Sequence, residues 1–253
     1  GARGDLENQL ANAERAVLEF EQSAQTVRAS QLRIVAANAA MSLGDWQLAR
    51  EHLEHAIPPA RRHALENVEA LCRANLGLVL ARGGDPDAGL AQLGTAIDLF
   101  ARQRDRRGEG GARAYRAQIQ LELGQDREAR ADAESADELL RVAPPLRPLA
   151  LAVRASALLR LGRVDAASEC AEEAWTIAEA HHAAEAEGWA LAALALVDAY
   201  QVTGDRDAAR ELVRHAASRI ADRAKRITDP ARRRRFLEAI PEHARLGELA
   251  AAD

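Results

Sequence analysis

The chain has 253 residues, of which 48% are hydrophobic and only 3% aromatic. This composition supplies a substantial core, and it favours helix formers over strand formers, so we expect an all-helical protein. The net charge of −5 argues against a global basic field for nucleic acid. No apolar run approaches the roughly 18 residues of a membrane span.

Glycines recur along the chain at a nearly constant spacing. They stand at positions 4, 44, 84, 124, 162 and 204, with gaps of 40, 40, 40, 38 and 42 residues. Asp follows four of them directly, at Asp5, Asp45, Asp85 and Asp205. Glycine permits the left-handed backbone that ends one helix, and Asp caps the start of the next. A fixed period of this size predicts a helical solenoid.

Small residues recur at fixed offsets from these glycines. The residue twelve positions later is Ala in every repeat: Ala16, Ala56, Ala96, Ala136, Ala174 and Ala216. Positions five after and seven before the glycine are also mostly small, as at Gly89 and Gly77. Small side chains let two helices approach closely, so these columns predict helix crossings. The alternative is an Ala-rich helical bundle without true repeats.

In chain order, the pattern predicts a half repeat and then five pairs of helices. The half repeat covers 4–28, and the pairs cover about 30–60, 61–102, 110–143, 146–181 and 183–227. Pro58-Pro59 is expected to end a helix, and the charged, Gly-rich stretch Arg102–Gly111 is expected to be a mobile loop.

Residues 229–253 differ from the repeats and predict C-terminal capping helices that start at Asp229-Pro230 and at Pro241. Because the array starts in mid-repeat, we expect the chain to be part of a longer protein.

The second repeat resembles the tetratricopeptide repeat (TPR) family. It carries Leu76-Gly77, Leu80, Gly84, Leu93 and Ala96 at that family's offsets, and the resemblance extends over 1–228. It implies a right-handed superhelical solenoid of antiparallel helix pairs, with a concave groove lined by the first helix of each pair. The period near 40 exceeds the family's usual value of about 34. HEAT-type repeats have a similar period, but the small-residue columns fit them less well.

The segment 229–245 is similar to the C-terminal ends of long bacterial multidomain regulators. These place a Ser/Thr kinase or a STAND-type ATPase before a tetratricopeptide array. The resemblance implies a signalling role in the bacterial cytoplasm.

Motifs for catalysis are missing from the sequence. It has no Gly-rich phosphate loop, nucleophile elbow or zinc-protease signature, so we expect no enzyme, no cofactor and no metal site. His52, His55 and His63 could suit a metal by spacing, but surface or packing histidines are the simpler interpretation. The basic run Arg232–Arg235 could contact phosphates or an acidic partner, or pair within the molecule. Cys72 and Cys170 are expected to be thiols in a reducing compartment.

The resemblance implies which residues line the groove. Carried over by offset from each glycine, the candidates are Asn38, Asn75, Leu78, Arg82, Tyr115, Gln118, Glu122, Ser156, Arg160 and Asp198. Asn38 and Asn75 match two positions of a clamp that some relatives use to hold a peptide's terminal carboxylate. That clamp's cationic positions are occupied here by Ile34, Gly111 and Tyr115, so a chaperone-tail clamp is not expected. The two asparagines could equally be ordinary surface amides.

The leading hypothesis is therefore a non-catalytic scaffold whose groove binds a peptide, a protein face or another domain of its own chain. The alternative is a regulatory or sensor domain of a larger bacterial kinase or ATPase, which binds a small effector. An enzyme in its own right is a distant third. We expect no membrane or nucleic-acid partner. Self-association is expected through the helix at 5–28, whose apolar face lacks its leading partner helix.

Overall fold

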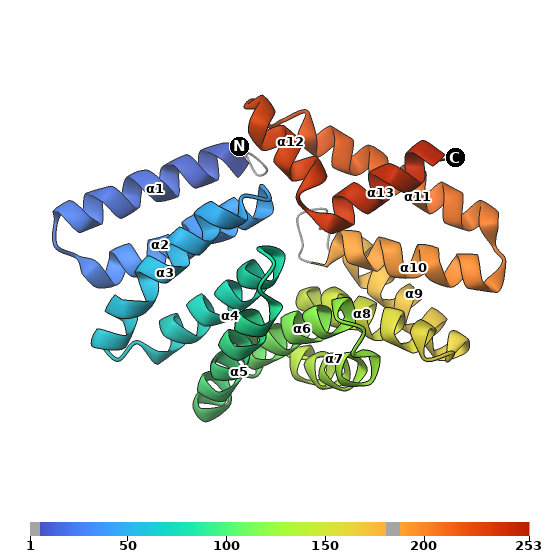
Figure 1. The fold of residues 1–253 in the computed structure, drawn as a ribbon, viewed down its shortest axis with the longest axis horizontal. Coiled ribbons are helices and arrows are strands. Elements are labelled where there is room, and N and C mark those ends of the chain that lie inside the picture. Colours follow the sequence, from blue (N-terminus) through green and yellow to red (C-terminus); the bar gives the residue numbers. More distant parts are fainter. Residues whose placement is uncertain (1–5, 181–187, 253) are drawn as a thin grey trace. The chain divides into compact units, whose positions relative to one another are not determined.

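The computed structural model describes residues 6–180 and 188–252 (Figure 1). These residues form helices and turns with no strand. The first helices are α1 (Leu6–Gln22), α2 (Thr26–Ser42), α3 (Trp46–Arg62), α4 (Glu66–Arg82), α5 (Pro86–Gln103), α6 (Arg106–Glu122) and α7 (Asp126–Leu140). After a short 3-10 turn η1 (Pro144–Leu146) come α8 (Arg147–Arg160), α9 (Val164–Ala180), α10 (Trp189–Thr203), α11 (Arg206–Ala224), α12 (Pro230–Glu238) and α13 (Pro241–Ala252). The predicted all-helical class is confirmed.

The glycine turns join the two helices of each pair. Gly44, Gly84, Gly124, Gly162 and Gly204 all have positive φ, between 71° and 93°. The side chain of Asp45 accepts a hydrogen bond from the backbone N of Leu48 at 3.3 Å, and Asp85 does the same for Ala88 at 3.0 Å. The Gly turn followed by an Asp cap is therefore present as the sequence predicted. Gly4 and the expected helix start at 183 lie outside the described residues.

A second set of turns joins one pair to the next without glycine. Ala24, Ala64 and Arg104 adopt left-handed φ values of 54°, 53° and 56°. These positions also repeat every 40 residues, since 64 − 24 and 104 − 64 are both 40. Residue type does not predict these turns, because Ala and Arg have no preference for a left-handed backbone.

The small-residue columns lie where helices cross. Ala56, Ala96, Ala136, Ala174 and Ala216 have no exposed surface. A Cβ added to Gly77 would lie 2.8 Å from the carbonyl oxygen of Gly89, and one added to Gly89 would lie 2.6 Å from that of Gly77. In the second full repeat the two backbones are thus in direct contact, as the prediction of close crossings requires.

Two sequence expectations about helix ends are wrong. Pro58 and Pro59 lie inside α3, which continues to Arg62. Ala60 is fully buried in this last turn, and α3 packs on α4, so tertiary packing holds the turn despite the missing amide donors. The structure also contradicts the expected mobile loop at 102–111, because α5 reaches Gln103 and α6 begins at Arg106.

The surroundings of Gly108 explain why the stretch 102–111 is helical where a loop was expected. A Cβ there would lie 2.4 Å from the ring of Phe100, which is buried. The backbone N of Gly108 donates to the Asp105 side chain at 2.9 Å, which caps α6. Gly108 therefore serves a close helix contact, and the glycine content that suggested a loop has a packing origin.

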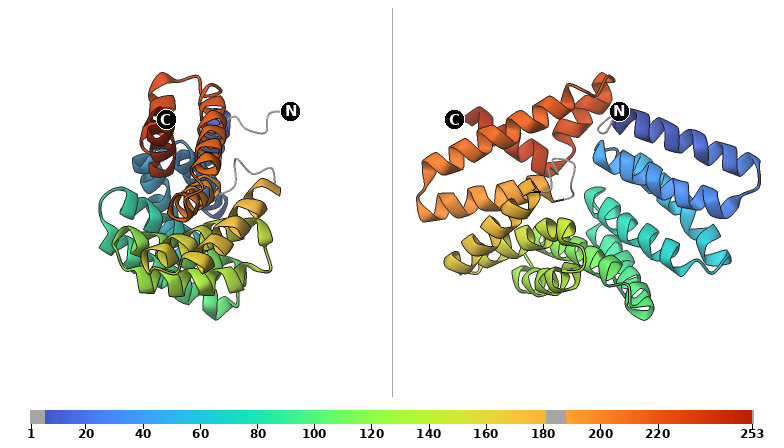
Figure 2. Two further views of the ribbon diagram at one scale, coloured as in Figure 1. Left: turned by 90° about the vertical axis from the view of Figure 1, so that its right-hand side faces the viewer. Right: turned by 180° about the vertical axis from the view of Figure 1, so that it is seen from behind.

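The chain divides into two compact units. The first contains residues 1–112 and 225–239, and the second contains 113–224 and 240–253. Within each unit, consecutive helices lie side by side, and Figure 2 shows α1 to α5 in this order from behind. The predicted capping segment is shared, with α12 in the first unit and α13 in the second. The division into an array at 1–228 and a cap at 229–253 stays a prediction.

The C-terminal segment of the first unit contacts the start of the chain. Glu7 of α1 accepts hydrogen bonds from the Thr228 hydroxyl and backbone N, each at 2.6 Å, and from the backbone N of Asp229 at 3.0 Å. Trp46 Nε1 donates to the carbonyl oxygen of Ala239 at 3.0 Å. Phe236 of α12 has no exposed surface. We call residues 227–239 the return segment, because it folds back on helices more than 190 positions earlier.

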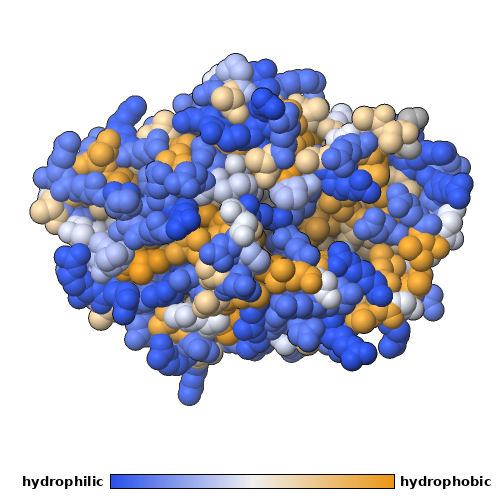
Figure 3. All heavy atoms as spheres, viewed as in Figure 1, coloured by the Kyte–Doolittle hydropathy of each residue, from blue (hydrophilic) through white to orange (hydrophobic). Residues whose placement is uncertain are grey.

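Most of the apolar face of α1 is buried. Leu10, Ala13 and Val17 are buried, and α1 packs on α2, whereas Leu18 is 58% exposed. Figure 3 shows apolar side chains in separate patches among polar ones on the face that it displays. Self-association through α1 stays a prediction, with Leu18 as the large apolar side chain that it would use.

Candidate functional site

The first helices of the first unit present an asparagine pair. Asn75 of α4 donates from Nδ2 to Oδ1 of Asn38 on α2 at 2.7 Å. Asn75 is buried and Asn38 is exposed. Leu78 is buried, and Arg82 is half-buried at the end of α4. The structure therefore brings the two asparagines together, and their mutual hydrogen bond joins neighbouring repeats.

The first helices of the second unit meet α13. Gln118 of α6 is buried and donates from Nε2 to Oε1 of Glu242 at 2.9 Å. Glu242 lies in the first turn of α13, so this bond joins the groove side of α6 to the last helix of the chain. Tyr115 is buried one turn earlier in α6, and Glu122 is exposed at its end.

Two arginines of the second unit act through their charge on Asp198 of α10. Although part of Asp198 of α10 stays exposed, the surrounding protein raises the pKa of its carboxyl by desolvation. Arg245 of α13 and Arg160 of α8 act in the opposite direction and lower it. Arg160 Nη1 also donates to the carbonyl oxygen of Leu121 at 2.6 Å and lies 3.3 Å from Asp126. Ser156 is half-buried one turn earlier in α8.

Helix α13 is itself seated by one face. It packs against α10 and α11, with Leu246 fully buried and His243 nearly so. Leu249 is half-buried. Glu242 accepts the hydrogen bond from Gln118, and Arg245 acts through its charge on Asp198. We call this set the seated face of α13; it consists of Glu242, His243, Arg245, Leu246 and Leu249. Its spacing of three to four residues is that of an amphipathic helix.

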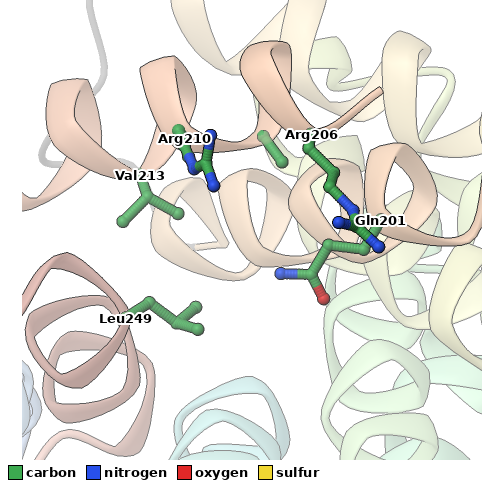
Figure 4. Close-up of a pocket in the computed structure, with 6 residues that line it drawn as sticks. Gln201, Arg206, Arg210, Val213 and Leu249 are labelled. Carbon is green, nitrogen blue, oxygen red and sulfur yellow. The ribbon is translucent and has the colours of Figure 1, made fainter. Parts of the chain in front are cut away.

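A cavity of about 320 Å³ remains next to this helix (Figure 4). It is lined by Gln201 of α10, Leu249 of α13, and Arg206, Ala209, Arg210 and Val213 of α11. Figure 4 shows the side chains of Arg206 and Gln201 close together on one side and those of Val213 and Leu249 on the other. The cavity therefore joins cationic and amide groups to apolar walls, which suits a carboxylate on an aliphatic stem.

Sequence reasoning found the first-helix residues of this region but missed the groups that meet them. These groups lie on elements that the sequence predicts to be the cap or second helices: Glu242 and Arg245 on α13, and Arg206 and Arg210 on α11. The amphipathic spacing of residues 241–252 was visible, but nothing in it showed that this helix returns to α6.

The basic run of α12 is used within the molecule. Arg233 donates to the carbonyl oxygen of Ile227, Arg234 pairs with Glu238 at 2.8 Å, and Arg235 pairs with Asp45 at 3.2 Å. These contacts favour the intramolecular interpretation over a phosphate-binding patch.

The histidines and cysteines form no metal-binding group among the described residues. His52 is buried, and its pKa is lowered by desolvation and then by Arg33, while Glu14 raises it. Its Nε2 lies 3.7 Å from Glu14, beyond hydrogen-bond distance. Burial raises the pKa of the Cys72 thiol to about 12 and also raises that of Cys170, so both favour the neutral thiol. No described helix has the length and apolar character to cross a membrane.

Comparisons with known proteins find the fold but no relative by sequence. No protein-family model and no curated protein matches the chain. Among solved structures, BtubC (BKLC) from P. vanneervenii has 19% identity and a TM-score of 0.64, over 86% of this chain and 91% of that one. A Rap protein complexed with Competence and Sporulation Factor has 12% identity and a TM-score of 0.61, over 99% of this chain and 74% of that one.

A third similar structure contains a tetratricopeptide repeat sensor. It is a STAND (Signal Transduction ATPase with Numerous Domains) protein with a tetratricopeptide repeat sensor from Pyrococcus horikoshii, with 16% identity and a TM-score of 0.59. The match covers 94% of this chain and 36% of that protein. Together with the helix pairs, the glycine turns and the small residues at the crossings, these likenesses identify the fold of the chain as that of the tetratricopeptide-like helical repeat proteins.

Proposed function

We propose that this chain is a non-catalytic interaction scaffold that binds a peptide or protein segment on the first helices of its repeats. The observation that carries the proposal is that the second unit already holds a helix, α13, which packs on α11 and α10 and accepts a hydrogen bond from α6. Gln118 donates that bond to Glu242, and Asp198 of α10 lies in the field of Arg245 of α13. A surface that seats one amphipathic helix has the shape and polarity to bind another.

The neighbours by fold support the same function. One of them was solved with a bound factor, and another uses its repeats as a sensor. Repeat arrays bind through extended preformed surfaces with a few anchors, which needs no catalytic group. We also propose a cytoplasmic location, in line with two cysteines that form no disulfide bond.

A charge reversal at Asp198 tests the proposal. Asp198→Arg would place a cation beside Arg160 and Arg245, so we expect loss of the captured partner in a pull-down. Asp87→Arg is the matched control, because Asp87 is exposed near the start of the second helix α5. Equal recovery with both variants, at wild-type helical content, would remove the first-helix surface from the function.

A second candidate is a regulatory domain that binds a small effector, attached to a kinase or ATPase. The cavity beside Leu249 favours it, since Arg206, Arg210 and Gln201 could hold an anion against apolar walls. The likeness to 36% of the length of a STAND protein that carries a tetratricopeptide repeat sensor agrees with this organisation. A thermal-shift screen of aliphatic carboxylates should find stabilisers that lose their effect in Arg206→Ala. A screen in which no carboxylate raises the melting temperature would count against this candidate.

A further inference from the structure

Helix α13 defines the chemistry of the ligand that the second unit accepts. We propose that the seated face of α13 is an internal copy of this ligand, and that an amphipathic helix with the same pattern replaces α13 on the second unit. The pattern is an acidic residue, a basic residue three positions later, and apolar residues four and seven positions later. In this chain it is Glu242, Arg245, Leu246 and Leu249. The inference rests on the proposed function and states what the partner looks like.

The contacts of α13 show what each position of the pattern recognises. The acidic position meets Gln118, a buried amide that donates at 2.9 Å. The basic position, Arg245, has a side chain that is 60% exposed, and its positive charge favours the ionised form of Asp198 on α10. The first apolar position, Leu246, is fully buried, and the second, Leu249, borders the cavity. A helix with another order of charges would bring an acid to Asp198 and leave the Gln118 donor unpaired.

Several features show that α13 fits this surface imperfectly. Only His243 and Leu246 are buried among its twelve residues. Gly247 lies inside the helix with no atom within 4 Å of an added Cβ, so it weakens the helix and gains no contact. Arg245 lies 3.4 Å from Glu248 of its own helix. The 320 Å³ cavity beside Leu249 is unfilled by the side chains that line it.

These imperfections distinguish α13 from a permanent core helix. A partner helix with Ala at the position of Gly247 and a larger side chain at that of Leu249 would be more helical and would fill the cavity. It would therefore compete with α13, although α13 has the advantage of being tethered to the same chain. Because both helices use the same surface, the partner binds only when α13 is released, and the two events form a single equilibrium.

A peptide competition on the full chain tests this. The probe is a fluorescein-labelled synthetic peptide of residues 240–252 with Gly247→Ala and Leu249→Phe, and fluorescence anisotropy measures its binding. Leu246→Ala in the chain removes the buried anchor of α13, so we expect this variant to bind the probe about tenfold or more tightly than the wild type. Adding Gln118→Glu places a carboxylate opposite the probe's glutamate and should reverse the gain. Gln9→Glu, on the exposed side of α1, is the charge-matched control and should leave the gain unchanged.

Hydrogen exchange on the wild-type chain gives a readout that needs no variant. Excess probe should speed exchange of the amides of 241–252 while α6 and α10 stay protected. Absence of saturable probe binding to natively helical Leu246→Ala, or unchanged exchange of α13 at saturating probe, overturns the inference. The pull-down uses native partners, so a partner helix of different pattern would still be captured by the wild-type chain and lost with Asp198→Arg. A failed peptide test beside a successful pull-down would therefore refute this inference and leave the proposed function intact.

Discussion

Between residues 24 and 124, glycines and other residues with left-handed backbone alternate, and they differ in their tolerance of substitution. Gly84 has φ of 93° with no atom near an added Cβ, so Gly84→Ala is opposed by backbone strain alone. We expect it to lower the free energy of unfolding by about 1 kcal/mol. Ala64 already has φ of 53°, and in Ala64→Gly the relief of strain is offset by a more flexible unfolded chain, which leaves stability nearly unchanged. Urea denaturation measures the free energy of unfolding of both variants. An equal loss of stability in Gly84→Ala and Ala64→Gly would contradict this difference between the two turns.

Asp198 should make stability depend on pH in a defined direction. Desolvation raises its pKa in the folded chain above the ordinary value, so the neutral carboxyl favours folding. This contribution is fully present below the unfolded pKa and is lost as the pH rises through the folded pKa. At neutral pH the charge is thus a cost, and we expect Asp198→Asn to melt at a higher temperature than the wild type.

The difference between Asp198→Asn and the wild type should shrink as the pH falls toward about 3, where both side chains are neutral. Melting curves across this range check it, with Asp87→Asn as the exposed control. A variant that melts lower than the wild type at pH 7 would show that Arg160 and Arg245 outweigh desolvation. A charged group that lowers stability is common at functional sites, so this result would agree with the proposed binding role of Asp198.

At the scale of a single helix, α6 contains two glycines that differ in surroundings. A Cβ at Gly108 would lie 2.4 Å from the Phe100 ring, whereas one at Gly111 would have no neighbour within 4 Å. We expect Gly108→Ala to destabilise the chain by about 1–3 kcal/mol through overpacking. Gly111→Ala should stabilise it by about 0.5–1 kcal/mol, because alanine favours the helix. Chemical denaturation compares the free energies of unfolding of the two variants. If both substitutions stabilised the chain, the close contact between Gly108 and Phe100 would be refuted.

The contact between α1 and the return segment should respond to acid. The hydrogen bond from the Thr228 side chain, together with those from the Thr228 and Asp229 backbone, holds the pKa of Glu7 below its usual range. A lowered folded pKa contributes stability above the unfolded pKa, and this contribution is lost as the pH falls through the folded value.

Glu7→Gln should therefore lower the melting temperature at neutral pH and flatten its fall in acid. Glu19→Gln is the control on the same helix, since Glu19 is exposed and its side chain accepts no such bonds among the described residues. Identical melting of Glu7→Gln and the wild type at pH 7 would show that Glu7 adds nothing to the contacts that Trp46, Arg235 and Phe236 make.

Elements were more predictable than their ends. The glycine period placed the helices because Gly44, Gly84 and their equivalents each supply a backbone that few residues adopt. The same rule failed for Pro58 and for Gly108, where packing against α4 and Phe100 outweighs local preference. Offsets from each glycine place the groove candidates, whose role in binding stays a prediction. The offsets do not reveal that Gln118 donates to Glu242, because this contact depends on long-range packing that no local pattern encodes.

At the scale of the molecule, the two halves of the C-terminal segment should stabilise different units. Phe236 belongs to the first unit and Leu246 to the second, and both are fully buried. Truncating such side chains to Ala costs about 2–5 kcal/mol. We expect Phe236→Ala to speed hydrogen exchange in α1–α5 and Leu246→Ala to speed it in α10 and α11. Loss of protection throughout the chain from either variant would show that the units do not unfold separately.

The return segment also has a consequence for how the protein is made. Repeat arrays can fold from the first repeat onward as the ribosome produces them, since each repeat needs only its neighbours. Here the first unit includes residues 225–239, and Glu7 pairs with Thr228, which is synthesised 221 residues later. The N-terminal repeats therefore stay incomplete until the 221 residues between Glu7 and Thr228 have been added. A nascent chain stalled before Thr228 should be more sensitive to protease in its first hundred residues than the released protein.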